Sequence, residues 1–167
     1  MKRLRAANLT LQPDKCEFLR HEVAYLGHVI TDDGVRPDPR KISSVKNFPV
    51  PRNLKNVRQL LGLAGYYRRF ISDFSRIAKP LSDLLKKDEK FIWNTGTQYA
   101  FDTLRDLLCK KPILQFPDFE KDFILTTDAS DYVIAGVLSQ GQIGQDLPIA
   151  YASRVFNAAE KNYSTIE

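Results

Sequence analysis

The hydrophobic pattern divides the chain into a first part with helical spacing and a last part with strand spacing. The longest helical pattern runs from Asn53 to Phe74, where apolar residues recur every three or four positions. At 100° per residue, one face of this helix would carry Val57, Leu60, Leu61, Ala64, Tyr67 and Ile71. The opposite face would carry Lys55, Arg58, Gly62, Gly65, Tyr66 and Arg69. The pattern predicts an amphipathic helix whose apolar face packs in the core.

Shorter elements flank this helix. Residues 2–9 are typical of the end of a basic helix, and prolines bracket a short helix at about 38–47. Further helices are predicted over 80–87, with Pro80 in the first turn, and over 97–110, with Thr97 as the N-cap. Polarity alternates along residues 23–30, and Asp33-Gly34 is a strong turn signal. We therefore predict a β-hairpin over about residues 16–36.

The last part of the chain reads as strands. Residues 123–128, 133–138 and 148–153 predict three successive strands separated by turn-rich segments. Residues 163–167 resemble the first turn of a helix. The predicted fold class is therefore α+β.

Charge is distributed unevenly over the 167 residues. The net charge of +5 combines about +9 over residues 1–100 with about −4 over residues 101–167. A basic first part is typical of a protein that binds a polyanion, most often nucleic acid. The acidic second part fits either a divalent-cation site or carboxylates that are simply solvated.

Two classes of protein are disfavoured. No apolar run approaches the ~18 residues that a membrane span needs, and the first residues lack the apolar core of a signal peptide. Cys16 and Cys109 form neither a disulfide framework nor a metal-ligand spacing. We expect a reduced, intracellular protein that is neither secreted nor inserted in a membrane.

The basic face of the long helix is the first candidate site. A glycine inside a helix lowers the stability of the helix by about 1 kcal/mol relative to alanine. The presence of Gly62 and Gly65 on this face therefore needs an explanation. One reading is a duplex whose groove approaches the helix backbone, with Tyr66 as a flat contact surface and Arg58 and Arg69 on phosphates or sugars. The other reading is tight packing against another helix, with the arginines solvated.

Asp128 is the second candidate. It follows a strand of Phe, Ile, Leu and Thr, and a carboxylate near the end of a buried strand needs a partner. Mg²⁺ prefers oxygen ligands and would supply one, whereas a hydrogen-bonded structural aspartate explains the pattern equally well. Asp131 is more simply a turn residue.

Five ordered blocks of sequence carry a resemblance to a known family. They are LQPDKCEF (11–18), YLGHVI (25–30), LLGLAGYYRRFI (60–71), TTDASD (126–131) and NYSTIE (162–167). Together they resemble the reverse transcriptase polyprotein of gypsy-type long-terminal-repeat retrotransposons. The resemblance implies that residues 1–36 are the C-terminal edge of the palm with the primer-grip hairpin. It further implies that residues 37–111 are a linker and helical thumb, and that residues 112–167 are the N-terminal, incomplete part of a ribonuclease H-like domain.

The resemblance also implies a set of functional residues and partners. An RNA/DNA hybrid or DNA duplex would be held by Leu26, Gly27, His28, Arg58, Gly62, Tyr66 and Arg69. Asp128 matches the first metal-binding carboxylate of the ribonuclease site, which in the complete enzyme takes Mg²⁺ or Mn²⁺. Glu167 is a weaker metal candidate, because the family pattern has a second glutamate two positions further on. The rest of the polyprotein would be a further partner, in a cytoplasmic particle or the nucleus.

Departures from the family pattern limit the expected activity. The Tyr-x-Asp-Asp motif of the polymerase is missing, and Asp32-Asp33 is not a substitute because it lies in a turn without the preceding tyrosine. Two-metal hydrolysis needs more than the one carboxylate at Asp128. We therefore expect the isolated chain neither to polymerise DNA nor to cut RNA.

The alternative is a domesticated or decayed remnant that binds nucleic acid or protein without chemistry. In either case the C-terminal third is expected to be the less stable part.

Overall fold

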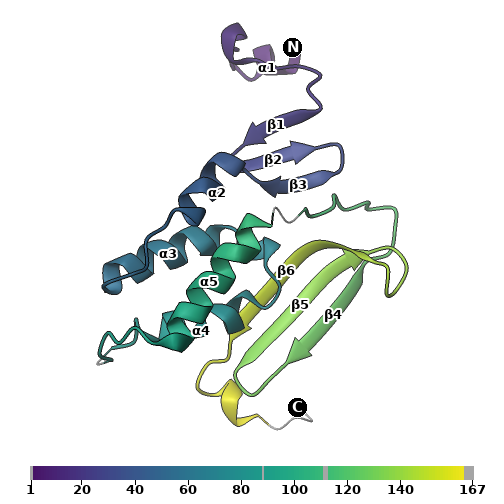
Figure 1. Cartoon of the computed structure of the whole chain (residues 1–167). Coiled ribbons are helices and arrows are strands. Elements are labelled where there is room, and N and C mark those ends of the chain that lie inside the picture. The colour runs from purple at the N-terminus through teal and green to yellow at the C-terminus, as the bar shows by residue number, and fades with distance from the viewer. Residues whose placement is uncertain (1, 88, 111–112, 164–167) are drawn as a thin grey trace.

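The computed structural model describes residues 2–87, 89–110 and 113–163. Two three-stranded antiparallel sheets lie on either side of a group of helices in the chain, which confirms the α+β class (Figure 1). The first sheet contains β1 (Glu22–Tyr25), β2 (His28–Thr31) and β3 (Gly34–Pro37). The helices are α2 (Pro39–Lys46), α3 (Leu54–Tyr66), α4 (Phe74–Asp83) and α5 (Thr95–Cys109). The second sheet contains β4 (Ile124–Ala129), β5 (Val133–Gln140) and β6 (Leu147–Val155).

The first sheet is a three-stranded meander in the order β1-β2-β3 rather than a single hairpin. The predicted turn after Thr31 is present, with Thr31 paired to Gly34. The continuous strand that we expected over residues 23–30 is wrong, because a second turn at Leu26-Gly27 pairs Tyr25 with His28. A two-residue turn leaves the alternation of polarity undisturbed on both sides, so the pattern alone did not reveal it.

The long predicted helix is two helices. α3 ends at Tyr66, a 3₁₀ turn follows at Arg68–Phe70, and Asp73 adopts left-handed backbone angles before α4 begins. Phe70 and Ile71 are buried in this connection and keep the apolar spacing of a helix. For this reason the periodicity did not show the break.

Two further predictions at helix ends are wrong. Pro80 lies inside α4 and does not begin a helix. The N-cap of α5 is Asn94, whose side chain accepts a hydrogen bond from the Thr97 backbone N–H at 3.0 Å. The Thr97 hydroxyl in turn accepts from the Asn94 backbone N–H at 2.8 Å, so Thr97 closes a capping box.

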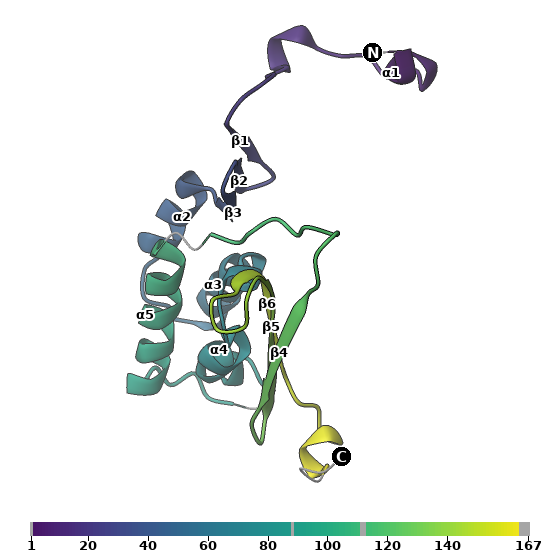
Figure 2. The same cartoon turned by 90° about the vertical axis from the view of Figure 1, so that its right-hand side faces the viewer.

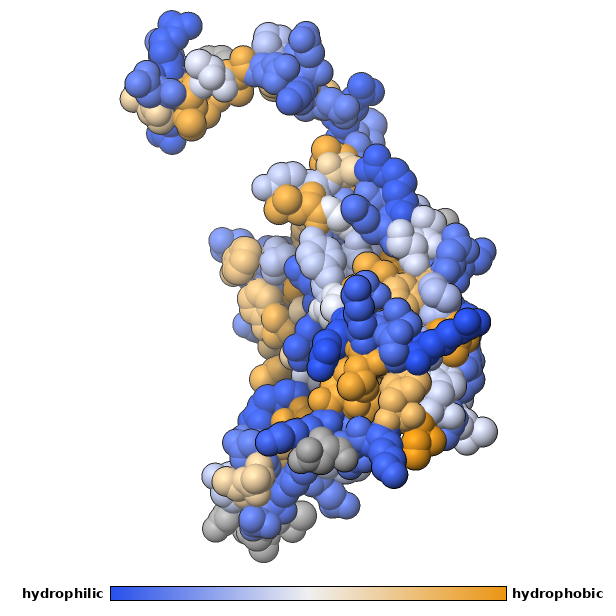
Figure 3. All heavy atoms as spheres, turned by 90° about the vertical axis from the view of Figure 1, so that its left-hand side faces the viewer, coloured by the Kyte–Doolittle hydropathy of each residue, from blue (hydrophilic) through white to orange (hydrophobic). Residues whose placement is uncertain are grey.

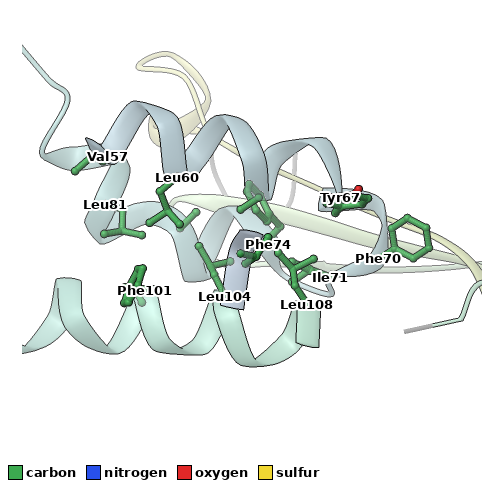
Figure 4. Packing of buried hydrophobic residues seen from close by; sticks show 14 of the residues in the cluster. Val57, Leu60, Tyr67, Phe70, Ile71, Phe74, Leu81, Phe101, Leu104 and Leu108 are labelled. Atoms are coloured by element: carbon green, nitrogen blue, oxygen red, sulfur yellow. The ribbon is translucent and has the colours of Figure 1, made fainter. Parts of the chain in front are cut away.

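One hydrophobic core joins the helices. The apolar faces of α3, α4 and α5 point toward one another, and Tyr67, Phe70 and Ile71 close one end of the cluster (Figure 4). α2 adds Ile42 and Val45. The remaining buried members are Val57, Leu60, Ala64, Phe74, Ala78, Leu81, Leu84, Ala100, Phe101, Leu104, Leu108 and Leu114.

The second sheet confirms the three predicted strands, in the order β4-β5-β6 with a bulge between Leu138 and Ser139. β6 lies against the helices and β4 forms the far edge (Figures 1 and 2). Ser153 on β6 is buried at this contact and bonds to Ser75 of α4. β6 is thus the strand of this sheet that packs directly on α4 in the described residues.

A second attachment joins the first sheet to the segment that leads into the second sheet. Val35 of β3 and Leu114 exchange backbone hydrogen bonds of 2.8 and 2.9 Å. Gly34 has a φ of +138°, and a Cβ built there would lie 2.2 Å from the Leu114 carbonyl oxygen. Only glycine fits this close approach.

The N-terminal segment projects from the body as an arm that includes α1 (Lys2–Ala6), as Figure 2 shows. Its surface mixes hydrophilic and hydrophobic residues (Figure 3). None of the helices in the described ranges combines the length and the apolar character that crossing a membrane requires. Most of the predicted C-terminal helical turn, including Glu167, lies outside the described residues.

Candidate nucleic-acid interface

The outer face of α3 is open. Arg58 and Gly62 are exposed, and a Cβ built on Gly62 or Gly65 would meet no atom of the described residues within 4 Å. Within this part of the chain, therefore, neither glycine packs against another helix. Asn53 caps the helix through its side chain, which accepts from the Asn56 N–H at 2.9 Å and fixes the start of this face.

The Leu26-Gly27 turn lies at the other end of α3. The Tyr66 hydroxyl donates to the Leu26 carbonyl, and the Tyr67 hydroxyl donates to the Gly27 carbonyl at 2.8 Å. Leu26 and Tyr66 expose 69 % and 52 % of their surface, so the turn and the helix end present apolar side chains to solvent together. Two candidate segments that are 40 residues apart in sequence thus form one surface.

His28 points into this contact and not out of it. Its ring lies 5.4, 5.7 and 5.6 Å from the rings of Tyr66, Tyr67 and Phe70. Nδ1 lies 2.9 Å from the Leu26 carbonyl oxygen, and because a carbonyl only accepts, Nδ1 carries the proton. Nε2 is buried without a hydrogen-bond partner among the described residues. His28 therefore supports the turn from behind.

Arg69 does not share the outer face of α3 with Arg58. The shared face that we expected assumed a helix as far as Phe74, but Arg69 follows the end of α3 in the 3₁₀ turn. Its guanidinium lies 5.8 Å from the centre of the Phe70 ring. Arg69 lines a groove of about 560 Å³ between the 3₁₀ turn and the second sheet, together with Arg68, Thr127 and Arg154.

A polar groove of about 470 Å³ lies beside the Leu26-Gly27 turn and includes Asp38, Arg40 and Lys41. Asp38 caps α2 by accepting from the Arg40 N–H at 2.9 Å and pairs with the Arg40 guanidinium. The hydrogen bond from the Arg40 side chain is the main cause that lowers the pKa of Asp38. The charge of Asp38 is therefore neutralised within α2.

Burial raises the pKa of Tyr67, with smaller contributions from Tyr66 and Asp38. Its hydroxyl accordingly stays protonated and remains a hydrogen-bond donor at neutral pH. The apolar pattern places Tyr67 in the core face of the helix and did not reveal this contact. The available signal was a tyrosine at a core position, because a buried hydroxyl requires a partner.

Asp128 lies near the end of β4, opposite Ala135 of β5. The largely buried strand that we expected is wrong, because every β4 residue after Ile124 is exposed. The described residues give the Asp128 carboxylate no hydrogen-bond or ion-pair partner. Over the same ranges, no three His, Cys, Asp or Glu side chains come together as a metal site would require.

Sequence comparison finds relatives among transposon polyproteins. The Retrovirus-related Pol polyprotein from transposon 297 of Drosophila melanogaster is 48 % identical over 167 residues, which cover 99 % of this chain and 15 % of the relative. The corresponding polyprotein from transposon gypsy, from the same organism, is 38 % identical over 100 % of this chain and 17 % of its own length. The chain thus spans less than a fifth of these relatives.

Solved structures with the same fold include two of the foamy viral protease-reverse transcriptase. The complex with dsDNA has a TM-score of 0.75 at 28 % identity, over 92 % of this chain and 32 % of that one. The complex with an RNA/DNA hybrid has a TM-score of 0.74 at 29 % identity, over 92 % of this chain and 21 % of that one.

A family model described as the RNase H-like domain found in reverse transcriptase matches residues 93–167. The match includes α5, which packs in the helical core, and so begins ahead of the domain boundary that we expected at residue 112; that boundary stays a prediction. Residues 93–167 are therefore similar to the RNase H-like domain found in reverse transcriptase, and nearly the whole chain is similar to the Pol polyproteins of gypsy-type retrotransposons.

Proposed function

We propose that this chain is the part of a retrotransposon reverse transcriptase that grips the template-primer duplex. The gripping surface consists of the outer face of α3 and the Leu26-Gly27 turn. Its ligand is an RNA/DNA hybrid or a DNA duplex. The proposed contacts are Arg58, Gly62, Tyr66 and Leu26. Arg69, in the groove beside the second sheet, is a further proposed contact.

The observation that carries the proposal is the open glycine position on α3. Gly62 is exposed, and an added Cβ would meet no described atom within 4 Å, although glycine weakens a helix. A bare backbone beside an arginine and a half-exposed tyrosine suits a ligand that approaches closely and carries phosphates. The foamy viral relatives were solved with dsDNA and with an RNA/DNA hybrid, which supports this class of ligand.

We propose a separate role for Asp128 in the complete polyprotein, as the first carboxylate of a ribonuclease H metal site. Mg²⁺ bound there would activate water for phosphodiester hydrolysis. The described residues alone do not fit such an ion, because Asp128 stands without other clustered ligands. We therefore assign no cleavage step to this chain and expect it to bind a hybrid without cutting it.

Fluorescence anisotropy with a labelled RNA/DNA hybrid tests the grip. We expect binding that weakens as salt rises, because each phosphate contact releases counterions. Arg58→Ala should reduce the salt slope by about one phosphate contact. Gly62→Leu should block the approach, and Tyr66→Ala should remove both a contact surface and the bond to Leu26.

Matched controls separate these effects from general ones. Lys161→Ala removes an exposed positive charge beyond β6, and Ser82→Leu puts a leucine on the exposed face of α4. Both controls should bind as the parent chain does. Absence of binding by a folded chain would contradict the proposal and favour the alternative of a remnant that binds a protein partner. Mg²⁺-dependent cutting of the RNA strand, lost in Asp128→Asn, would contradict the expected inactivity.

A further inference from the structure

The Leu26-Gly27 turn has a backbone that its sequence does not favour. Leu26 has a φ of +45° and Gly27 a φ of +72°. Two-residue turns with both angles positive usually contain asparagine or aspartate before glycine. A bulky residue such as leucine is an outlier there, and such strain persists only where surrounding contacts fix it.

Two tyrosines of the helical part supply those contacts. The Leu26 carbonyl accepts from the Tyr66 hydroxyl and lies 2.9 Å from His28 Nδ1. The Gly27 carbonyl accepts from the Tyr67 hydroxyl at 2.8 Å and from the Asp38 N–H at 3.0 Å. Both carbonyls of the turn are therefore held by donors from other parts of the chain.

The fit is close as well as polar. A Cβ built on Gly27 would lie 3.3 Å from both Tyr66 Cε1 and the Tyr67 hydroxyl oxygen. A side chain at this position would force the turn or the two rings to give way by a few tenths of an ångström. Glycine is thus required both by its φ and by the short distance to the tyrosines.

The two tyrosines differ in what else they can do. Tyr66 is 52 % exposed and is itself a proposed duplex contact, whereas Tyr67 is 1 % exposed and cannot touch a ligand. The Tyr67 ring fills the core, and a phenylalanine would fill the same space. Only the hydroxyl group of Tyr67 reaches the turn.

We infer that Tyr67 is a positioning residue. Its buried hydroxyl holds the Leu26-Gly27 turn against the end of α3, so that turn and helix form one preformed surface for the duplex. This inference rests on the proposed function of that surface. A surface that is ordered before binding loses less conformational entropy on binding, so its affinity is higher.

The test uses Tyr67→Phe in the full 167-residue chain, with Tyr99→Phe as the control. Tyr99 is 74 % exposed on α5 and is not part of the proposed surface. We expect Tyr67→Phe to weaken hybrid binding about fivefold, the effect of one ordinary hydrogen bond, with its circular dichroism unchanged. In the free chain, the Asp38 amide should exchange faster with solvent, because its acceptor, the Gly27 carbonyl, is no longer held in place. Tyr99→Phe should change neither measurement.

The possible results are distinguishable. If the parent chain binds and Tyr67→Phe binds equally well, the positioning role is wrong while the proposed grip stands. If the folded parent chain does not bind, the proposed function fails and the positioning role fails with it. Gly27→Ala provides a second variant in case Tyr67→Phe does not fold: it leaves both hydroxyls in place and pushes the turn away. Full binding by Gly27→Ala would also overturn the inference.

Discussion

Gly62 lies inside α3, exposed to solvent, where an added methyl group would meet no described atom within 4 Å. We expect Gly62→Ala to raise the free energy of unfolding by about 1 kcal/mol, because alanine restricts the unfolded chain and favours the helix. Urea denaturation of the full chain measures this gain. The same variant should bind a hybrid more weakly, because its methyl group lies where the groove would approach.

Gly34→Ala is the contrasting variant. Its Cβ would lie 2.2 Å from the Leu114 carbonyl oxygen at a φ of +138°, so the chain must shift and lose stability. If the Gly62→Ala chain is no more stable than the parent, glycine at this position does not weaken α3. Tighter binding by that chain would contradict an approach of the duplex to Gly62.

Single residues on α3 were predictable where the helix is regular. The 100° spacing placed Arg58, Gly62 and Tyr66 on the outer face, and the structure exposes all three, although their binding role remains a proposal. The same arithmetic failed for Arg69, because it lies beyond the helix end. The spacing also could not predict the hydrogen bond from the Tyr67 hydroxyl to the Gly27 carbonyl, because the two residues are 40 positions apart.

At the scale of elements, α4 is stabilised by a residue from a distant strand. Asp73 occupies the N-cap position but makes no capping bond through its side chain within the described residues. The Ser153 hydroxyl of β6 instead accepts from the Ser75 N–H at 2.9 Å. The Ser75 hydroxyl and the Arg68 guanidinium both donate to the Ser153 carbonyl. β6 therefore provides the cap of α4.

We expect Ser153→Ala to lower the free energy of unfolding by about 1 kcal/mol, the usual effect of losing an N-cap. Urea denaturation provides the value, and amide exchange at Ser75 provides the local check. Ser72→Ala, at an exposed serine just before α4, is the control and should have little effect. Equal stability of Ser153→Ala and the parent would mean that water caps the helix equally well.

Strands bounded by turn residues were predictable from the local sequence pattern, whereas breaks within a continuous apolar pattern were not. The three strands of the second sheet were found because their apolar runs are bounded by turn residues. The break between α3 and α4 was missed because Phe70, Ile71 and Phe74 pack in the core with helical spacing on both sides of it. Pro80 was read as a helix start, although the buried positions Ala78 and Leu81 continue the face of α4 through it.

On the scale of the whole molecule, the second sheet packs against the helices mainly at its β6 edge. Its β6 edge is attached to α4 and the Arg68–Phe70 turn, whereas β4 pairs only with β5 among the described strands. Leu125 on β4 is 68 % exposed, whereas Leu60 of α3 and Leu104 of α5 are 1 % and 0 % exposed. A region with few buried apolar contacts opens more readily than one with many.

Native-state hydrogen exchange should therefore separate the molecule into two regions. We expect amides of β4 and β5 to exchange at least ~10-fold faster than those of α3 and α5, which corresponds to an opening free energy lower by about 1.4 kcal/mol. Ser153→Ala should increase exchange in β6 and leave α5 unchanged, because it weakens the contact between β6 and α4. Equal protection of residues 119–163 and the helices would contradict this picture. It would show that the attachment through β6 is enough to make sheet and helices one cooperative unit.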